Sequence, residues 1–159
     1  MGVLRISEIR ICAHNIAEQL PMDLLLLADP DKHMIETYIH NGSIYKLLED
    51  EQVLGVSVLV PRPGATAEIV NIAIAEDAQG KGFGTRLLQH TIDAARQAGY
   101  LHLKVGTGNS SLDQLAFYQK NGFRIVGVLR DYFVKHYNEP IFENGIPCRD
   151  MVLLEMDLT

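Results

Sequence analysis

A glycine-rich turn lies between an apolar run and an amphipathic helix near the middle of this chain. Residues 79–84 read Gln-Gly-Lys-Gly-Phe-Gly; the apolar run Ile69–Ala75 precedes them, and a helical pattern begins at about Gly82. Glycine has no Cβ that would keep a ligand away from the backbone. The N–H groups of a first helical turn attract anions, and the helix dipole favours negative charge there. The order strand, glycine turn, helix therefore predicts a socket for a phosphorylated ligand.

The size and charge of the chain restrict the number of domains and the classes of ligand that we expect. The chain has 159 residues, of which 47% are hydrophobic and 21% charged, so we expect residues 1–159 to form a single globular domain. The formal net charge of −6 argues against a nucleic-acid-binding surface and suits a cationic small molecule better. Cys12 and Cys148 form no CxxC pair and are expected as free thiols in a reducing compartment. No targeting signal or membrane-length apolar run stands out, so we expect a cytoplasmic protein without a membrane partner.

Hydrophobic periodicity and turn residues divide the chain into strands and helices. Strands are expected at Val3–Glu8, Ser43–Leu48, Val53–Val60, Thr66–Ala75, Leu101–Val105, Phe123–Leu129 and Met151–Leu158. Helices are expected at 16–28, at Lys32–Ile39 with Asp31 as its cap, at Gly82–Ala98, and after a capping box formed by Ser111 and Gln114. Hairpin-linked strands are antiparallel, and the strand–helix–strand unit in the middle is a parallel crossover. The sequence therefore predicts an α/β fold with a mixed, mostly antiparallel sheet flanked by helices.

Two common nucleotide-binding turns do not fit the glycine spacing. A dinucleotide turn needs G-x-G-x-x-G, but Thr85 stands where the third of these glycines belongs. The acidic residue expected about 20 residues later is also missing, since Lys104 stands nearby. A Walker P-loop needs Gly-Lys followed by Ser or Thr, and the chain has no such sequence. The spacing therefore excludes both NAD-type and P-loop readings of the turn.

The pattern Gln-x-x-Gly-x-Gly at 79–84 resembles the GCN5-related N-acetyltransferase (GNAT) superfamily. The preceding run Ile72-Ala73-Ile74 adds to the resemblance, as does the later run 115–123, which reads Leu-Ala-Phe-Tyr-Gln-Lys-Asn-Gly-Phe. These motifs lie in the middle of the chain, and the expected order of elements extends the likeness to nearly all of it. The resemblance implies a GNAT-like fold whose central β-α-β unit binds acetyl-CoA, the acetyl donor of these enzymes.

The contacts implied for acetyl-CoA agree with the predicted anion socket. Backbone N–H groups of the turn would hold the CoA pyrophosphate, with the Lys81 side chain as a nearby cation. The backbone of Ile72 and Ile74 would pair with the pantetheine arm, and one N–H there would polarise the thioester carbonyl. The implied cofactor-binding residues are Ile72, Ala73, Ile74, Gln79, Gly80, Lys81, Gly82, Phe83, Gly84, Thr85 and Asn109. His33, Glu36 and His40 fall at i, i+3 and i+7 on an expected helix, but the H-E-x-x-H pattern is absent, so we expect a solvated face and no metal site.

Acetyl transfer to an amine needs a base and an acid. An amine with a pKa near 10 is mostly ammonium at neutral pH and must lose a proton before it attacks. By family position, Glu68 would take that proton, usually through water, and Tyr118 would donate a proton to the departing CoA thiolate. The ordinary alternatives are a strand-end charge in water for Glu68 and a packed core tyrosine for Tyr118. No cysteine lies in either motif, so we expect direct transfer without an acyl-enzyme.

The chain departs from the family pattern at two places. Many members have an asparagine seven residues before the tyrosine that contacts the cofactor, and Ser111 stands there. Asn109 lies two residues earlier and is either a substitute for it or a turn residue that tolerates left-handed backbone. The branch that acetylates ribosomal proteins uses a glutamate on the next strand where this chain has Gly106, which disfavours that substrate.

The segment Arg130–Arg149 is long for a plain hairpin and is rich in aromatic residues. Long ordered loops are commonly functional, so this one is a candidate wall for the acceptor, with Glu139 or Glu143 beside aromatic rings for a cationic amine. The alternative is a loop packed on the body of the protein or on a second subunit, and a homodimer is left open. We therefore expect an N-acetyltransferase for a primary amine of a small molecule or peptide. The rival hypothesis is a catalytically silent module that binds or senses acyl-CoA.

Overall fold

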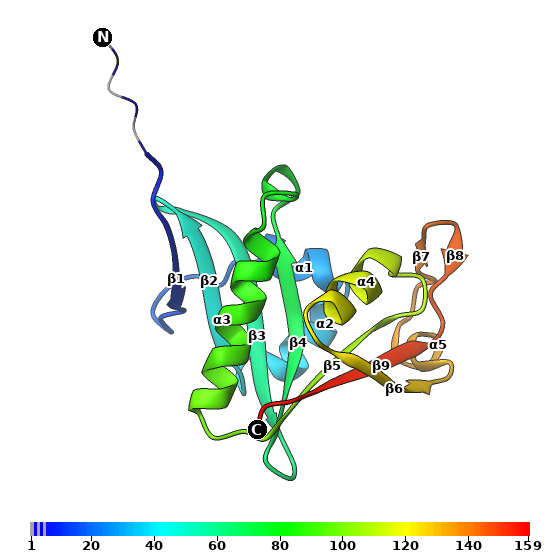
Figure 1. Ribbon diagram of the computed structural model, residues 1–159. Helices are drawn as coiled ribbons and strands as arrows, with labels where there is room; N and C mark the ends of the chain where they lie inside the picture. The colour runs from blue at the N-terminus through cyan, green and yellow to red at the C-terminus, as the bar shows by residue number, and fades with distance from the viewer. Residues whose placement is uncertain (1, 3, 5) are drawn as a thin grey trace. The chain divides into compact units, whose positions relative to one another are not determined.

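The computed structural model describes residues 2, 4 and 6–159, which fold into two compact units. The first unit comprises the described residues up to Val60 together with Val70–Ala94. The second comprises Pro61–Ile69 and Ala95–Thr159, so strand β4 (Thr66–Ile74) contributes to both (Figure 1). No helix in the described part of the chain is long and apolar enough to cross a membrane.

An antiparallel sheet forms the centre of the first unit. Strand β1 (Ile9–Ala13) pairs with β2 (Ser43–Glu49), which pairs with β3 (Gln52–Arg62), and the last residues of β4 come next in strand order. The helices of this unit are α1 (Met22–Ala28), α2 (Lys32–Tyr38) and most of α3 (Phe83–Gln97), preceded by the short 3-10 turn η1 (Glu76–Ala78). The glycine turn follows the end of β4 in this sheet.

The side chains of β3 alternate between the two faces of this sheet. Each face therefore presents side chains that pack against helices. Val58 and its even-numbered neighbours on β3 belong to an apolar core with Leu25 of α1 and Ile35 of α2. The odd-numbered Ser57 instead forms a 2.7 Å hydrogen bond with Thr91 of α3. In Figure 1, α3 lies in front of these strands and α1 lies behind them.

The second unit contains the parallel pair of strands that the sequence predicts. Residues Thr66–Ile69 of β4 pair in parallel with the start of β5 (His102–Gly108). Strand β5 pairs antiparallel with β9 (Met151–Asp157), which pairs antiparallel with β6 (Arg124–Leu129). The remaining elements are α4 (Leu112–Lys120), α5 (Tyr132–His136), β7 (Phe142–Glu143) and β8 (Ile146–Pro147). One parallel ladder among several antiparallel ones confirms the predicted mixed α/β fold.

The first strand and the first helix begin later than the sequence predicts. Of the expected strand Val3–Glu8, residues 3 and 5 lie outside the described residues and the others form no strand, whereas β1 starts at Ile9. The helix expected from residue 16 starts at Met22. Asn15 accounts for this delay, because its side-chain Oδ1 accepts the N–H of Ala17 at 3.0 Å and holds the segment in a turn.

Asp31 and Ser111 show two outcomes for predicted helix caps. The Asp31 carboxylate accepts the N–H of His33 at 2.9 Å, which confirms the predicted cap of α2. The capping box predicted at Ser111 is wrong, because that side chain makes no capping bond to α4. Its hydroxyl donates instead to the Glu143 carboxylate at 2.9 Å, so a tertiary bond replaces the local one.

Candidate functional site

The glycine turn has the backbone conformation that only glycine adopts easily. Gly80 and Gly82 have φ angles of +79° and +82°, in the left-handed region. A Cβ at either position would find no heavy atom within 4 Å, so neighbouring protein atoms do not fill the space beside these two residues. The carbonyl of Gly82 accepts the first helical bond of α3, from the N–H of Arg86 at 3.2 Å. The N–H groups at the start of α3 therefore border open space and suit a phosphate.

A side-chain bond holds the turn against the end of β4. The Gln79 amide donates from Nε2 to the carbonyl of Ile74 at 3.0 Å. The Ala75 N–H donates to the Leu54 carbonyl of β3 at 2.8 Å, which fixes the strand end from the other side. Ile72, Ala73 and Ile74 thus belong to the same unit as residues 79–85. The sequence-predicted cofactor residues of the first unit form one continuous strand-and-turn segment.

Tyr118 is buried among aromatic rings on α4 in the second unit. Its side chain is 4% exposed, and its ring makes an edge contact with Phe123 at 5.6 Å and a tilted contact with Phe117 at 5.5 Å. Burial raises the pKa of the Tyr118 hydroxyl well above its usual range. The phenol therefore keeps its proton at neutral pH, as a proton donor must.

Glu68 is half-buried on β4 and is paired with Arg62 at the end of β3. The Glu68 Oε1 atom lies 3.1 Å from Arg62 Nε, and the Glu68 side chain is 27% exposed. Both residues belong to the second unit. A carboxyl group is one of the side chains that can take a proton as a general base.

Asn109 organises the loop that precedes β9. Its Oδ1 atom accepts the backbone N–H groups of Arg149 at 2.8 Å and Asp150 at 3.0 Å. Its Nδ2 atom donates one of its two protons to the carbonyl of Pro147 at 3.1 Å. The second amide proton is the group on this side chain that suits an additional ligand contact.

A family model described as the acetyltransferase (GNAT) family matches residues 7–123 of this chain. The chain belongs to the GNAT family. It is 49% identical over 136 residues to a Bacillus subtilis protein named uncharacterized N-acetyltransferase YvbK, covering 86% of this chain and 88% of that one. These findings confirm the sequence-based identification as an acetyl-CoA-dependent acetyltransferase.

Solved structures of other GNAT proteins match nearly the whole fold. A GNAT acetyltransferase from Elizabethkingia anophelis with acetyl-CoA bound has a TM-score of 0.92 and 46% identity, covering 94% of this chain and 97% of that one. A Bacillus subtilis acetyltransferase in complex with CoA has a TM-score of 0.90 and 45% identity, covering 96% and 100%. The GNAT fold therefore extends beyond the segment that the family model matches.

The long loop of this GNAT protein contains regular structure and lines a small open pocket. The segment expected only as a loop contains α5 and the β7–β8 hairpin, and a cavity of ≈ 270 Å³ lies within the second unit. Its lining includes Phe133, Tyr137, Glu139, Phe142 and Cys148. Three of the aromatic residues and one of the glutamates in the segment that the sequence suggests as an acceptor wall therefore line one hollow.

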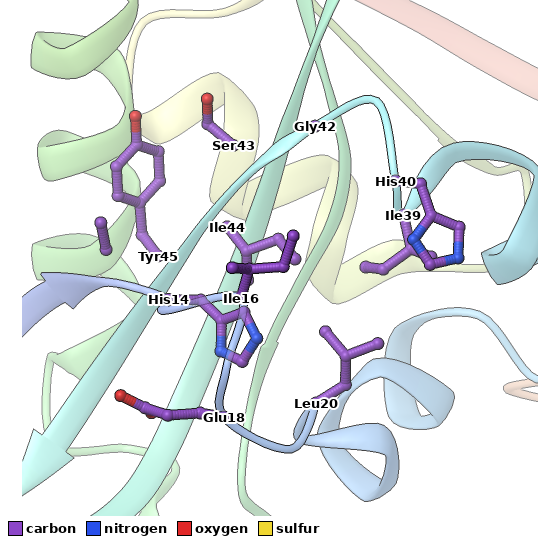
Figure 2. Close-up of a pocket in the computed structure, with 11 residues that line it drawn as sticks. His14, Ile16, Glu18, Leu20, Ile39, His40, Gly42, Ser43, Ile44 and Tyr45 are labelled. Atoms are coloured by element: carbon purple, nitrogen blue, oxygen red, sulfur yellow. The ribbon is translucent and has the colours of Figure 1, made fainter.

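A larger pocket of ≈ 580 Å³ lies at the start of β2 in the first unit, and its described lining contains none of the predicted site residues. Figure 2 shows His14 and Ile44 on one side of it and Leu20, Ile39 and His40 on the other. At its wall the Glu18 carboxylate pairs with the buried Lys46 ammonium. Burial and the nearby Lys46 lower the pKa of His14. Two separate chain segments, 13–20 and 39–45, build this pocket, so no local sequence pattern reveals it.

Asn71 is a buried polar residue that the sequence reasoning missed. It is 3% exposed on β4 and lies one position before Ile72. Its amide donates to the Leu25 carbonyl at 2.9 Å and to the Tyr38 hydroxyl at 3.0 Å. An asparagine inside an otherwise apolar strand was the available signal, since a buried amide needs partners from other elements.

Proposed function

We propose that this GNAT protein transfers an acetyl group from acetyl-CoA to a primary amine of a small molecule or peptide by direct transfer. The observation that carries the proposal is the turn at Gly80 and Gly82, with left-handed backbone and open space at the start of α3. Relatives that are 46% and 45% identical hold acetyl-CoA and CoA in their crystal structures, which supports the same donor for this chain. The ≈ 270 Å³ hollow in the long loop supports a small amine or the end of a peptide as the acceptor.

In the first unit, the proposed role of residues 79–85 is to bind the CoA pyrophosphate. Backbone N–H groups donate to the phosphate oxygens, and the exposed Lys81 side chain adds positive charge. The segment Ile72–Ile74 follows the part of β4 that pairs with β5, and its backbone groups are assigned to the pantetheine arm. One N–H of this segment donates to the thioester carbonyl oxygen, which stabilises the negative charge that forms there during attack.

In the second unit, Glu68 is proposed as the base and Tyr118 as the acid. The amine nitrogen loses a proton to Glu68, through a water, and forms a bond to the carbonyl carbon of the thioester. The carbon–sulfur bond breaks, and the Tyr118 hydroxyl protonates the departing thiolate. Proton exchange with solvent then restores both side chains. Asn109 is proposed to contact the cofactor with its second amide proton. Its other hydrogen bonds, to Pro147 and Arg149, give it a further role in ordering the loop before β9.

The test is an assay of thiol release from acetyl-CoA with a panel of amines. The panel contains polyamines, aminoglycosides, amino acids and peptides with free N-termini, and mass spectrometry identifies the acetylated product. We expect turnover with at least one class of primary amine. Calorimetric binding of acetyl-CoA without turnover of any amine would replace this proposal with the silent sensing module. Failure to bind acetyl-CoA at all would contradict both.

A further inference from the structure

Asn71 connects strand β4 to two helices of the first unit through directional bonds. Its Nδ2 atom lies 2.9 Å from the Leu25 carbonyl oxygen of α1 and 3.0 Å from the Tyr38 hydroxyl of α2. A carbonyl oxygen only accepts hydrogen bonds, so the nitrogen of the amide must face Leu25. Both amide protons are thereby assigned, one to each helix.

The Tyr38 hydroxyl continues the chain of bonds to a buried carboxylate. Because it accepts from Asn71, its own proton points to Oδ2 of Asp29, which lies 3.4 Å away in the link between α1 and α2. Burial raises the pKa of Tyr38 well above its usual range, so this proton stays on the hydroxyl. Asp29 is 8% exposed, and its Oδ1 accepts the N–H of Asp31 at 3.2 Å. Each group in this series donates to the next, from Asn71 on β4 through Tyr38 to Asp29 in the α1–α2 link.

The arrangement is not the one that stability alone would favour. The Oδ1 atom of Asn71 is buried and has no hydrogen-bond partner among the described residues. An unpaired buried oxygen of this kind is destabilising, and an apolar side chain of similar size avoids the penalty. Both hydrogen-bond partners of Asn71 have a second partner of their own. The Leu25 carbonyl also accepts the Asp29 N–H at 3.1 Å, and the Tyr38 hydroxyl also bonds to Asp29.

What Asn71 adds is a fixed position for the strand. Helices α1 and α2 also share an apolar core with β3 and β4, formed by residues such as Leu25, Ile35, Val58 and Ala73. Apolar packing is not directional and tolerates small shifts along a strand, whereas two amide hydrogen bonds do not. Ile72, the next residue, begins the segment whose backbone N–H is assigned above to the thioester carbonyl.

We propose that Asn71 is a positioning residue for acetyl transfer, holding the backbone of Ile72–Ile74 in place by bonding β4 to α1 and α2. This inference rests on the proposed function of that segment. A displacement of about 1 Å in a group that acts on the reacting carbonyl is enough to lower the rate about 100-fold. Asn71 therefore acts on the reaction through the strand and does not itself touch the acetyl group.

The experiment compares Asn71→Leu with the matched control Thr91→Val. Thr91 is also buried in the same unit and bonds to Ser57 and to the Leu87 carbonyl, but it lies on α3 and not on β4. The probe is acetyl-CoA with carbon-13 in its carbonyl, and infrared difference spectra report the polarisation of that carbonyl in the bound state. Thermal unfolding and CoA affinity are measured on the same samples.

For wild type we expect the bound carbonyl band at lower frequency than in free acetyl-CoA. Asn71→Leu should lose most of this shift and about 10-fold or more in transfer rate, with a melting temperature close to wild type. Thr91→Val should melt earlier and keep the full shift. Tyr38→Phe, which removes one of the two anchors, should give an intermediate shift and tests the inference independently if Asn71→Leu fails to fold.

Two results would distinguish a failure of the proposed function from a failure of the positioning role of Asn71. A wild-type spectrum without any shift on binding would contradict the polarising N–H of the proposed function. A full shift and full rate in both Asn71→Leu and Tyr38→Phe would overturn the positioning role while leaving the proposed function intact.

Discussion

At the scale of single residues, the proposed base Glu68 and the proposed acid Tyr118 lie in different surroundings. Glu68 is partly exposed and is paired with Arg62 at 3.1 Å. Tyr118 is enclosed by Phe117 and Phe123, and burial raises the pKa of its hydroxyl. Acid and base roles are commonly divided by such differences in environment. The assignment of Glu68 as base and Tyr118 as acid is tested by replacing each residue in turn.

Replacing the proposed acid removes a single oxygen atom. We expect Tyr118→Phe to lower the transfer rate by about 100-fold, the lower end of what a general acid contributes. CoA affinity and melting temperature should change little, because the ring and its contacts with Phe117 and Phe123 remain. The measurement is steady-state thiol release with Tyr100→Phe as the control. A wild-type rate for Tyr118→Phe would make Tyr118 a packing residue only.

Replacing the proposed base should make the rate strongly dependent on pH. Glu68→Gln should lose most acetyl transfer near neutral pH while CoA binding persists. The rate should recover as the pH approaches the pKa of the amine, near 10, because the free amine then needs no base. The control is Glu155→Gln, since Glu155 forms a comparable strand ion pair with Lys104 at 3.7 Å in the same unit. Full activity of Glu68→Gln at pH 7 would remove Glu68 from the mechanism.

At the scale of secondary structure, the ends of strands and helices carry the proposed chemistry. The glycine turn connects β4 to α3, and Asn109 follows the last residue of β5. The three bonds of Asn109 to residues 147, 149 and 150 fix the chain just before β9. A further bond from Asn144 Nδ2 to the Ser110 carbonyl, at 2.9 Å, holds the β7–β8 hairpin to the same loop. The end of β5 therefore orders the proposed acceptor wall.

The two roles of Asn109 predict two separate effects of its removal. Asn109→Ala should destabilise the fold by about 2 kcal/mol, as expected for the loss of several hydrogen bonds. It should also weaken CoA binding several-fold if the second amide proton contacts the cofactor, as proposed. The measurements are thermal unfolding and calorimetric titration with CoA. A lower melting temperature with unchanged CoA affinity would leave Asn109 the loop-ordering role alone.

Sequence patterns predicted most elements because their apolar residues follow strand and helix periods. The central strand, the glycine turn and the helix after it were predicted within one or two residues. Glu68 and Tyr118 stay predictions that rest on family position. The failures have a common cause, which is competition from polar side chains. Asn15 forms a turn where an apolar pattern favours helix, and Ser111 bonds to Glu143 and not to its own helix. The partners of Asn71 are distant in sequence, so their bonds were not visible in it.

At the scale of the whole molecule, one strand takes part in both compact units. Residues Thr66–Ile69 of β4 belong to the second unit and Val70–Ile74 to the first. The chain also enters each unit more than once, since Pro61–Ile69 interrupts the first. Units that share a strand in this way cannot be separated at a single linker. We therefore propose that residues 1–159 behave as one domain.

A single domain should unfold in one step. Differential scanning calorimetry should give one transition whose calorimetric and van't Hoff enthalpies agree. CoA at about 100 times its dissociation constant should stabilise the folded state by about 2.7 kcal/mol and move the whole transition upward. Two transitions, of which CoA shifts only one, would contradict the single-domain proposal.

The most direct test of the central claim is the calorimetric titration of CoA into wild type, Gly82→Ala and Gly99→Ala. Gly82 and Gly99 lie just outside opposite ends of α3, with φ angles of +82° and +92°, and an added Cβ meets no atom within 4 Å at either one. Each substitution should therefore cost a similar amount of stability, about 1–2 kcal/mol. If the glycine turn binds the pyrophosphate, Gly99→Ala should bind CoA like wild type, and Gly82→Ala should bind it about tenfold more weakly or worse. Equal CoA affinities for the two variants would contradict the assignment of residues 79–85 as the CoA site.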